Sequence, residues 1–168
     1  APAFQVNRLC GRGLQAIVSG IQLLQLGDAT AVLAGGVEVM SRGPYILPAH
    51  RWGARMGDSG LTDMLLGALH DPFGIGHMGI TAENVAQDYN ISRASMDEFA
   101  AESQARASAA QSAGYFKEQI VPLTVKQGRK EINFESDEFI RSETTFDSLA
   151  NLRPAFARDG LVTAGNSS

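Results

Sequence analysis

Cysteine is nearly absent from this sequence, since Cys10 is the only one among 168 residues. A single cysteine excludes a disulfide within the chain and is typical of a reducing compartment. Long apolar runs are lacking too, because none approaches the roughly 20 residues of a membrane-spanning helix. No signal-peptide pattern is present. We therefore expect a cytoplasmic location and no membrane association.

Basic residues are also fewer than acidic residues. The chain has 14 Lys and Arg residues against 18 Asp and Glu residues, a net charge of −4. General nucleic-acid binding and membrane-surface binding both need an excess of basic residues, so we expect neither partner. An anionic ligand held by a few local arginines is compatible with this charge. No metal site is predicted.

The ends of the chain lack the usual features of a complete protein. The chain begins APAFQV, without a methionine, and stops at VTAGNSS, inside a stretch rich in turn-forming residues. A length of 168 residues corresponds to about one domain. We interpret the sequence as an internal piece of a longer chain.

Residues 1–40 predict half of an α/β unit. Apolar residues recur at helical spacing between residues 9 and 26, at Leu14, Ile17, Val18, Ile21 and Leu24. Gly27 stands where a glycine commonly ends a helix. The run ATAVLAG, residues 29–35, is short and continuously apolar. Such a run is typical of a strand buried on both faces of a parallel sheet.

Residues 41–168 read as a long insertion with small elements of its own. Residues 41–60 are dense in Gly, Pro and Arg and predict a loop. The clearest element is a helix from Arg93 to about Ser112, with Ser92 as its N-cap and Gly114 after its end. The other predicted elements are short: helices within 61–69, 80–89 and 142–152, and two strands within 119–134 around Gln127-Gly128.

Cys10 lies in the stretch NRLCGRGLQAI, where the helical pattern begins. A thiol at a helix N-terminus has its thiolate stabilised by unpaired N–H groups and the helix dipole. Gly11 and Gly13 leave room beside it and permit a tight turn. These features are typical of a nucleophile. The alternative is a small buried residue, as free cysteines often are, and spacing alone leaves both open.

Four motifs together resemble the thiolases, the family of acetyl-CoA acetyltransferases and β-ketothiolases. They are NRLCGRGLQAI, GGVEVMSRGPY, HMGITAENVA and LRPAFARDGLVTAGNSS, and their order and spacing match along the whole chain. Residues 51–73 look closest to bacterial biosynthetic β-ketothiolases of the polyhydroxyalkanoate type. The resemblance implies that Cys10 attacks an acyl-CoA thioester and carries the acyl group. A second acyl-CoA then yields β-ketoacyl-CoA, and the reverse reaction cleaves it, as in fatty acid metabolism.

The resemblance also implies an α/β thiolase fold. Residues 1–40 would be part of the N-terminal βαβαβαββ half, with the nucleophile helix and a core strand. Residues 41–168 would be nearly all of the inserted α+β loop domain, which holds CoA over the nucleophile. Acetyl-CoA and other acyl-CoA thioesters are the implied substrates, with no further cofactor.

Three residues match positions along the pantetheine arm of CoA. His77 and Met78 match a pair beside the arm, and Leu69 matches an apolar residue that packs along it. For Met78, simple core packing is the alternative, because methionine fills irregular gaps.

Two residues match positions at the nucleotide end of CoA. Arg141 matches an arginine beside the adenine and phosphates, where a guanidinium can stack on the purine and attract phosphate. Ser148 matches a position near the adenosine. For Arg141, the alternative is a surface ion pair with Asp137 or Glu138.

Phe156, Ala164 and Ser168 match a wall residue and a turn that contacts the pantetheine. Arg51 and Arg55 lie in the loop that joins dimers in tetrameric thiolases, so a homotetramer built as a dimer of dimers is implied. Solvated surface arginines are the alternative for this loop.

The sequence departs from the family at Arg12, because thiolases usually read Cys-Gly-Ser-Gly where this chain reads Cys-Gly-Arg-Gly. Arg12 could stabilise the thiolate of Cys10. It could instead point along the helix toward a dimer partner, at a cost of several kcal/mol if buried without a partner. A sequence error is the third alternative.

Two family motifs, Gly-His-Pro and Cys-x-Gly-Gly, do not occur in these 168 residues. In thiolases the first supplies a histidine that activates the nucleophile, and the second supplies the cysteine that moves the α-proton. We therefore expect the 168-residue chain alone to be inactive. The competing hypotheses are a thiolase-like acyl-CoA or lipid-binding protein without catalysis, and a condensing enzyme that acts on acyl carriers.

Overall fold

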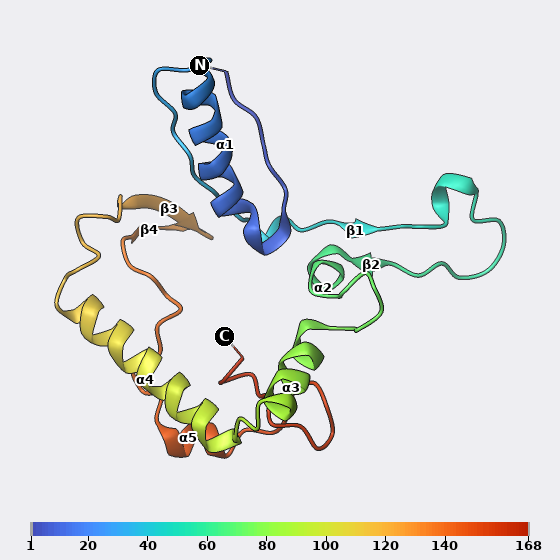
Figure 1. Ribbon diagram of the computed structural model, residues 1–168, viewed down its shortest axis with the longest axis vertical. Coiled ribbons are helices and arrows are strands. Elements are labelled where there is room, and N and C mark those ends of the chain that lie inside the picture. Colours follow the sequence, from blue (N-terminus) through green and yellow to red (C-terminus); the bar gives the residue numbers. More distant parts are fainter. Residues whose placement is uncertain (1, 168) are drawn as a thin grey trace. The chain divides into compact units, whose positions relative to one another are not determined.

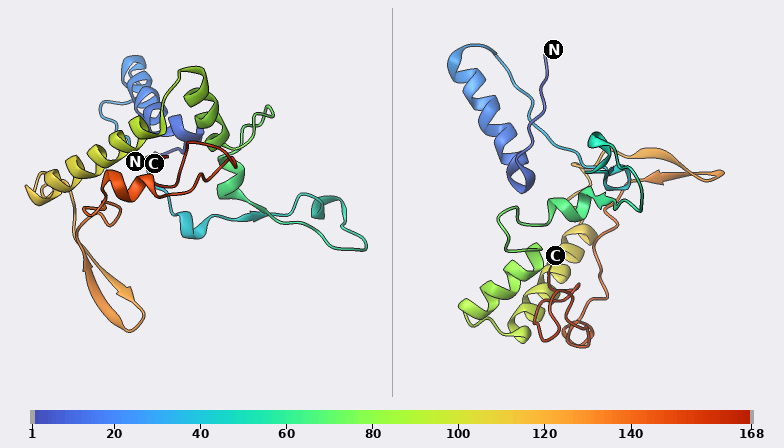
Figure 2. Two further views of the ribbon diagram at one scale, coloured as in Figure 1. Left: turned by 90° about the horizontal axis from the view of Figure 1, so that it is seen from below. Right: turned by 90° about the vertical axis from the view of Figure 1, so that its right-hand side faces the viewer.

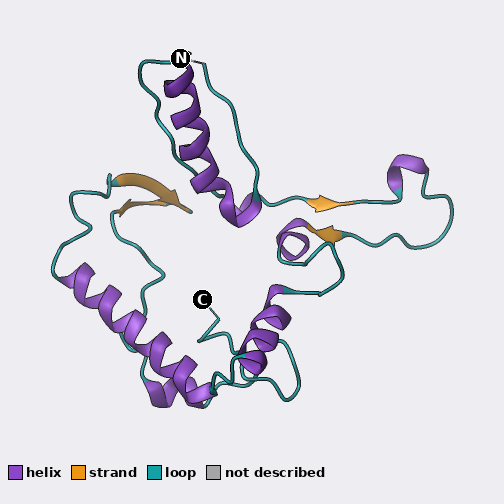
Figure 3. Ribbon diagram, viewed as in Figure 1, coloured by secondary structure: helices purple, strands orange, loops and turns teal. Residues whose placement is uncertain are grey.

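A computed structural model describes residues 2–167 of the chain. The chain divides into two units, Ala1–Asp71 and Pro72–Ser168. Figure 1 colours both along the sequence, and Figure 3 separates their helices, strands and loops. The domain boundary predicted at Met40 concerns the complete family fold and stays a prediction.

The first unit is built around helix α1, Arg12–Leu26. A 3-10 turn, η1 (Leu9–Gly11), leads into it, and Gly27 ends it with a left-handed φ of 77°. The predicted helix and its glycine cap are therefore confirmed. Gly20 is the buried residue of α1, and a Cβ there would lie 2.9 Å from Val32 Cγ1, so the returning chain packs closely on the helix.

The predicted strand at residues 29–35 is wrong for this chain. The segment has no strand partner among the described residues, and it runs alongside α1 as an irregular connection (Figure 1). Leu33 is 99% exposed rather than buried. An apolar run becomes a strand only where neighbouring strands accept its backbone hydrogen bonds.

The rest of the first unit is the loop predicted from the Gly, Pro and Arg content, with short elements in it. β1 and β2 pair antiparallel, with Tyr45 opposite Asp63. Asp63 also caps the predicted short helix, because its carboxylate accepts the Leu65 N–H at 2.8 Å. The elements are η2 Met40–Arg42, β1 Tyr45–Ile46, η3 His50–Trp52, β2 Thr62–Asp63 and α2 Met64–Ala68.

The second unit contains three helices, α3 (Met78–Asp88), α4 (Arg93–Ser112) and α5 (Phe146–Ala150). The helix predicted after Ser92 is confirmed, since the Ser92 hydroxyl accepts the Ser95 N–H at 3.2 Å. The short helices predicted within 80–89 and 142–152 correspond to α3 and α5.

The predicted pair of strands is confirmed as β3 (Leu123–Gln127) and β4 (Lys130–Phe134), an antiparallel hairpin. Gly128, with φ 65°, supplies the turn between them. Both views in Figure 2 show this hairpin extending away from the helices of its unit.

The core of the second unit draws one buried apolar residue from each of four segments. They are Ala86 of α3, Ala100 of α4, Leu149 of α5 and Val162 of the final segment. Among residues 2–167, no helix is long and apolar enough to cross a membrane.

Candidate active site and coenzyme pocket

The thiol of Cys10 is exposed at the entrance to α1. Cys10 lies within η1, directly before Gly11, the N-cap of α1. Leu9 has a φ of 45°, a left-handed conformation that costs a residue with a Cβ about 1–2 kcal/mol. The Asn7 side chain supports this turn by accepting the Leu9 N–H at 3.1 Å. A strained turn that presents a thiol at a helix start is typical of a nucleophile, and in this structure Cys10 is exposed rather than buried. The nucleophilic role of Cys10 stays a prediction.

Arg12 is paired within the first unit. Its guanidinium donates to the Glu38 carboxylate, and the two side chains are 46% and 43% exposed. The cost of a buried charge without a partner therefore does not arise within this chain. Glu38 lies in the GGVEVMSRGPY motif, so the pair links the two motifs of this unit.

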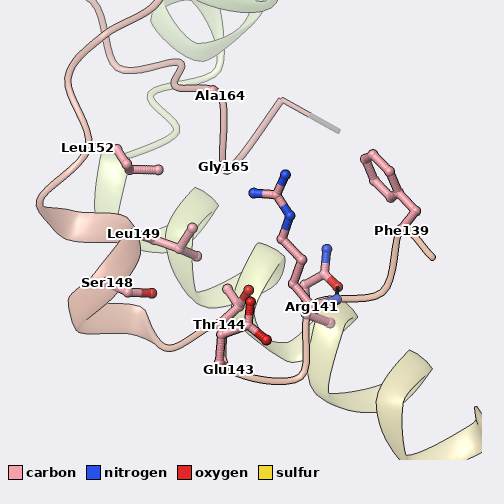
Figure 4. Close-up of a pocket in the computed structure, with 10 residues that line it drawn as sticks. Phe139, Arg141, Glu143, Thr144, Ser148, Leu149, Leu152, Ala164 and Gly165 are labelled. Carbon is pink, nitrogen blue, oxygen red and sulfur yellow. Dashed lines mark hydrogen bonds between the residues drawn. The ribbon is translucent and has the colours of Figure 1, made fainter.

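One pocket of the second unit brings together three of the predicted coenzyme residues, which are Arg141, Ser148 and Ala164. Its volume is about 320 Å³. Figure 4 shows these residues arriving from three segments, with the Arg141 side chain extending toward the segment of Ala164 and Gly165. The other lining residues are Gln104, Phe139, Glu143, Thr144, Leu149, Leu152 and Gly165.

Arg141 is available to an anionic ligand. Among the described residues, its guanidinium forms no ion pair with Asp137 or Glu138. Its backbone N–H donates to Gln104 Oε1 at 2.8 Å, which ties the Arg141 loop to α4. A guanidinium beside a pocket lined in part by Leu149 and Leu152 suits a phosphate-bearing ring system.

Ser148 holds the start of α5 in a capping box with Thr145. Its hydroxyl accepts the Thr145 N–H at 3.0 Å and donates to the Thr145 carbonyl at 2.8 Å. The hydroxyl's proton is therefore used within the helix cap, and only acceptor capacity remains for a ligand.

His77, Met78 and Phe156 form a second cluster at the start of α3. His77 is the N-cap, and its Nδ1 accepts the Gly79 N–H at 3.0 Å. The His77 ring stacks on Phe156 with centroids 5.0 Å apart and planes 21° apart. A Cβ at Gly79 would lie 2.1 Å from Phe156 Cγ, so this packing requires glycine.

Met78 and Leu69 are each partly exposed, at 39% and 43%. Met78 is the first residue of α3, and Leu69 is the C-cap of α2 in the other unit. The predicted contact of Ser168 lies outside the described residues. The ligand roles of all these residues stay predictions.

Sequence reasoning missed the buried carboxylate of Asp97. An acidic residue near the start of a helix by itself indicates only a favourable interaction with the helix dipole. In the structure its side chain is 1% exposed and pairs with Arg93, with Nε to Oδ2 at 2.6 Å. The i,i+4 spacing of the two residues was the available signal, but it does not reveal burial.

Comparison with known proteins places the chain among thiolases. The family profile described as "Thiolase, N-terminal domain" matches residues 1–168. The chain is 60% identical to Beta-ketothiolase BktB of Cupriavidus necator, covering 100% of this chain and 43% of that protein. It is 48% identical to an acetyl-CoA acetyltransferase of the same organism, over 99% of this chain and 43% of that protein. The chain thus spans less than half the length of these relatives.

Solved structures agree with this assignment. The Bacillus anthracis acetyl-CoA acetyltransferase matches with a TM-score of 0.93 at 46% identity, over 98% of this chain and 42% of that one. Human mitochondrial 3-ketoacyl-CoA thiolase in complex with CoA matches with a TM-score of 0.91 at 43% identity, over 99% and 42%. These matches show that the predicted thiolase fold is right.

Proposed function

Because this chain belongs to the thiolase family, we propose that it is the nucleophile-bearing part of an acetyl-CoA C-acetyltransferase. The observation that carries the proposal is the exposed thiol of Cys10, set directly after the strained residue Leu9 at the entrance to α1. The names of the relatives, a β-ketothiolase and acetyl-CoA acetyltransferases, support the same reaction class.

In the proposed reaction, the Cys10 thiolate attacks the thioester carbonyl of acetyl-CoA and expels CoA. The acetyl group is then bound to the sulfur of Cys10. A second acetyl-CoA loses an α-proton, and its α-carbon attacks the acetyl carbonyl. The carbon–sulfur bond to Cys10 breaks, the thiolate returns, and acetoacetyl-CoA leaves. Covalent transfer divides one difficult condensation into two easier steps.

In this proposal, residues of the second unit hold the coenzyme. The pocket around Arg141, Ser148 and Ala164 takes the nucleotide end and the adjoining part of CoA. The Arg141 guanidinium, which has no ion pair among residues 2–167, can bind phosphate and stack on adenine. The His77, Met78 and Phe156 cluster contacts the pantetheine arm. Ser168 would complete the arm's contacts.

We also propose a location, an assembly and a pathway for the whole protein. The whole protein would be a cytoplasmic homotetramer joined through the loop of Arg51 and Arg55, and would supply β-ketoacyl-CoA for polyhydroxyalkanoate synthesis. The similarity to a bacterial β-ketothiolase supports the β-ketoacyl-CoA product, and the location, assembly and pathway follow from the family resemblance. We propose that the 168-residue chain alone does not turn over, because it contains neither Gly-His-Pro nor a second cysteine.

Acetyl transfer to Cys10 in the whole protein tests the proposal. The protein is mixed with acetyl-CoA, quenched in acid and digested, and the peptide of residues 9–12 and its flanks is examined by mass spectrometry. We expect one acetyl group on Cys10, and a loss of about a thousandfold or more in acetoacetyl-CoA formation for Cys10→Ser. The proposal is wrong if condensation proceeds while Cys10 stays unmodified, or if Cys10→Ser retains full activity.

A further inference from the structure

Two walls of the coenzyme pocket are held by side chains that do not line it. One wall is the end of α5, with Leu149 and Leu152, and the other is the final turn, with Ala164 and Gly165. Both walls are short segments, so their positions depend on what anchors them to the rest of the unit. The anchors come from the first turns of α4.

Arg93 anchors the first wall. Its Nη2 donates to the carbonyl oxygens of Leu149 at 2.6 Å and Leu152 at 3.0 Å. Its Nε donates to Asp97 Oδ2 at 2.6 Å. One guanidinium therefore binds a carbonyl of α5, a carbonyl just beyond its end and the carboxylate of α4 at the same time, which its planar fork of donors permits.

Asp97 anchors the second wall through Asn166. Asp97 Oδ1 accepts a hydrogen bond from Asn166 Nδ2 at 2.9 Å. Asn166 in turn closes the final turn, because its Oδ1 accepts the Thr163 N–H at 2.8 Å and its Nδ2 also donates to the Leu161 carbonyl at 3.2 Å. Ala164 and Gly165 lie inside this closed turn.

The Arg93–Asp97 pair is largely buried, so breaking it should cost considerable free energy. The Asp97 side chain is 1% exposed and that of Arg93 is 22% exposed. Removing one partner would leave the other charge poorly compensated in a low-dielectric site. Such a network therefore has one preferred arrangement, and it sets the distance between the two walls.

We propose that Arg93, Asp97 and Asn166 are positioning residues for the coenzyme pocket. They would hold both walls at the separation that the nucleotide end of CoA requires, opposite the Arg141 loop. Residues 93, 97 and 104 share one face of α4 by their spacing, and Gln104 fixes the Arg141 backbone. One face of α4 thus holds three parts of the pocket, which are the wall at the end of α5, the final turn and the Arg141 loop. This inference rests on the proposed function.

The test compares two substrates in the whole protein. Acetyl-CoA reaches the pocket with its nucleotide, whereas S-acetyl-N-acetylcysteamine keeps the thioester and lacks the nucleotide. For Asp97→Asn and Asn166→Ser we expect the Kd of CoA to rise about tenfold, equal to about 1.4 kcal/mol. Acylation of Cys10 by S-acetyl-N-acetylcysteamine should stay within about twofold of the wild-type rate.

The matched control is Glu102→Gln on the same helix. Glu102 and Arg106 form an i,i+4 ion pair like that of Arg93 and Asp97, but their side chains are 59% and 76% exposed. Its loss should leave both measurements unchanged. If Asp97→Asn does not fold, Asn166→Ser and the conservative Asp97→Glu carry the test, with Asp97→Glu restoring part of the affinity.

Each result decides a different claim. A folded Asn166→Ser protein that binds CoA with wild-type affinity would overturn the positioning role. Equal losses with both substrates would overturn it too, because that pattern indicates general damage rather than a displaced nucleotide pocket. If the wild-type protein forms acetyl-Cys10 and binds CoA, the proposed function stands whichever way the variants behave. If the wild-type protein neither forms acetyl-Cys10 nor binds CoA, the proposed function is wrong, and the positioning role that rests on it is wrong too.

Discussion

Glu83 accepts the backbone N–H of Val162 at 2.9 Å, and its other carboxylate oxygen accepts the N–H of Leu161 at 2.8 Å. Helix α3 is thereby tied to the final segment of its unit. The fit is close, because a Cβ at Gly160 would lie 2.1 Å from Glu83 Oε1. Glu83 thus supports the segment that carries the pocket turn.

Glu83→Gln should lower the free energy of unfolding by about 1–3 kcal/mol. An amide can accept from only one of the two N–H groups, and its own NH₂ would face the other donor. Urea unfolding of the whole protein measures the change. Glu98→Gln, at an exposed position of α4, is the control and should be neutral; equal effects at both sites would contradict the anchoring role of Glu83.

Leu9→Ile should destabilise the turn that presents Cys10. A β-branched residue tolerates positive φ poorly, and Leu9 has φ 45°. Leu9 is 54% exposed, so the change in side-chain shape alone should matter little there. We expect a loss of about 1 kcal/mol in stability and slower acetylation of Cys10, measured by quenched-flow mass spectrometry.

The control for this change is Leu14→Ile in α1, at a site that is 69% exposed with ordinary helical geometry. It should cost only a few tenths of a kcal/mol. The strain argument fails if Leu9→Ile matches Leu14→Ile in both stability and acetylation rate.

Arg12 and Glu38 should couple only weakly. Both side chains are nearly half exposed, at 46% and 43%, and solvent screens such pairs to about 1 kcal/mol or less. A double-mutant cycle of Arg12→Gln and Glu38→Gln, followed by urea unfolding, gives the coupling energy, which should fall further in high salt. A coupling of several kcal/mol that resists salt would mean that the pair is buried in the whole protein.

Elements with local signals could be predicted from the sequence, and elements that depend on distant partners could not. Ser92 and Gly27 marked helix ends through their own backbone preferences, so α4 and α1 were located closely. The run at 29–35 has strand composition, yet a strand also requires neighbours to bond. The described residues supply none.

The site likewise contains features with local sequence signals and features that depend on residues far away in the sequence. Glycines and the helical pattern placed Cys10 at a helix start without any comparison. The burial of Asp97 depends on Asn166, which lies 69 residues away in the sequence, and the bonds of Glu83 reach 79 residues along it. No window of sequence contains such pairs. Arg141 and Ser148 were identified only through the family resemblance, because neither has a distinctive spacing.

Thr81→Val should stabilise the protein. The Thr81 hydroxyl is buried and has no hydrogen-bond partner among the described residues. Replacing it by a methyl group of similar size removes that unpaired polar atom, which should raise the free energy of unfolding by about 1 kcal/mol. Thr163→Val is the contrasting control, because the buried Thr163 hydroxyl accepts the N–H groups of Gly165 and Asn166. A loss of stability in both variants would show that the Thr81 hydroxyl has a partner elsewhere in the whole protein.

His77→Asn separates the two roles of His77. Asparagine is a good N-cap, so it can replace Nδ1 as the acceptor of the Gly79 N–H and keep α3 intact. It cannot stack on Phe156 as the imidazole does. We therefore expect stability within about 1 kcal/mol of the wild type and a KM for acetyl-CoA raised about tenfold, with kcat falling less.

His77→Ala is the companion variant, because it loses both the cap and the ring. It should match His77→Asn in KM but lose about 1 kcal/mol more in stability. If His77→Asn binds acetyl-CoA as the wild type does, capping is the whole role of His77, and the pantetheine contact proposed for it is wrong. Because asparagine keeps a capping acceptor and lacks the ring, whereas alanine lacks both, the pair of variants assigns each effect to its own cause.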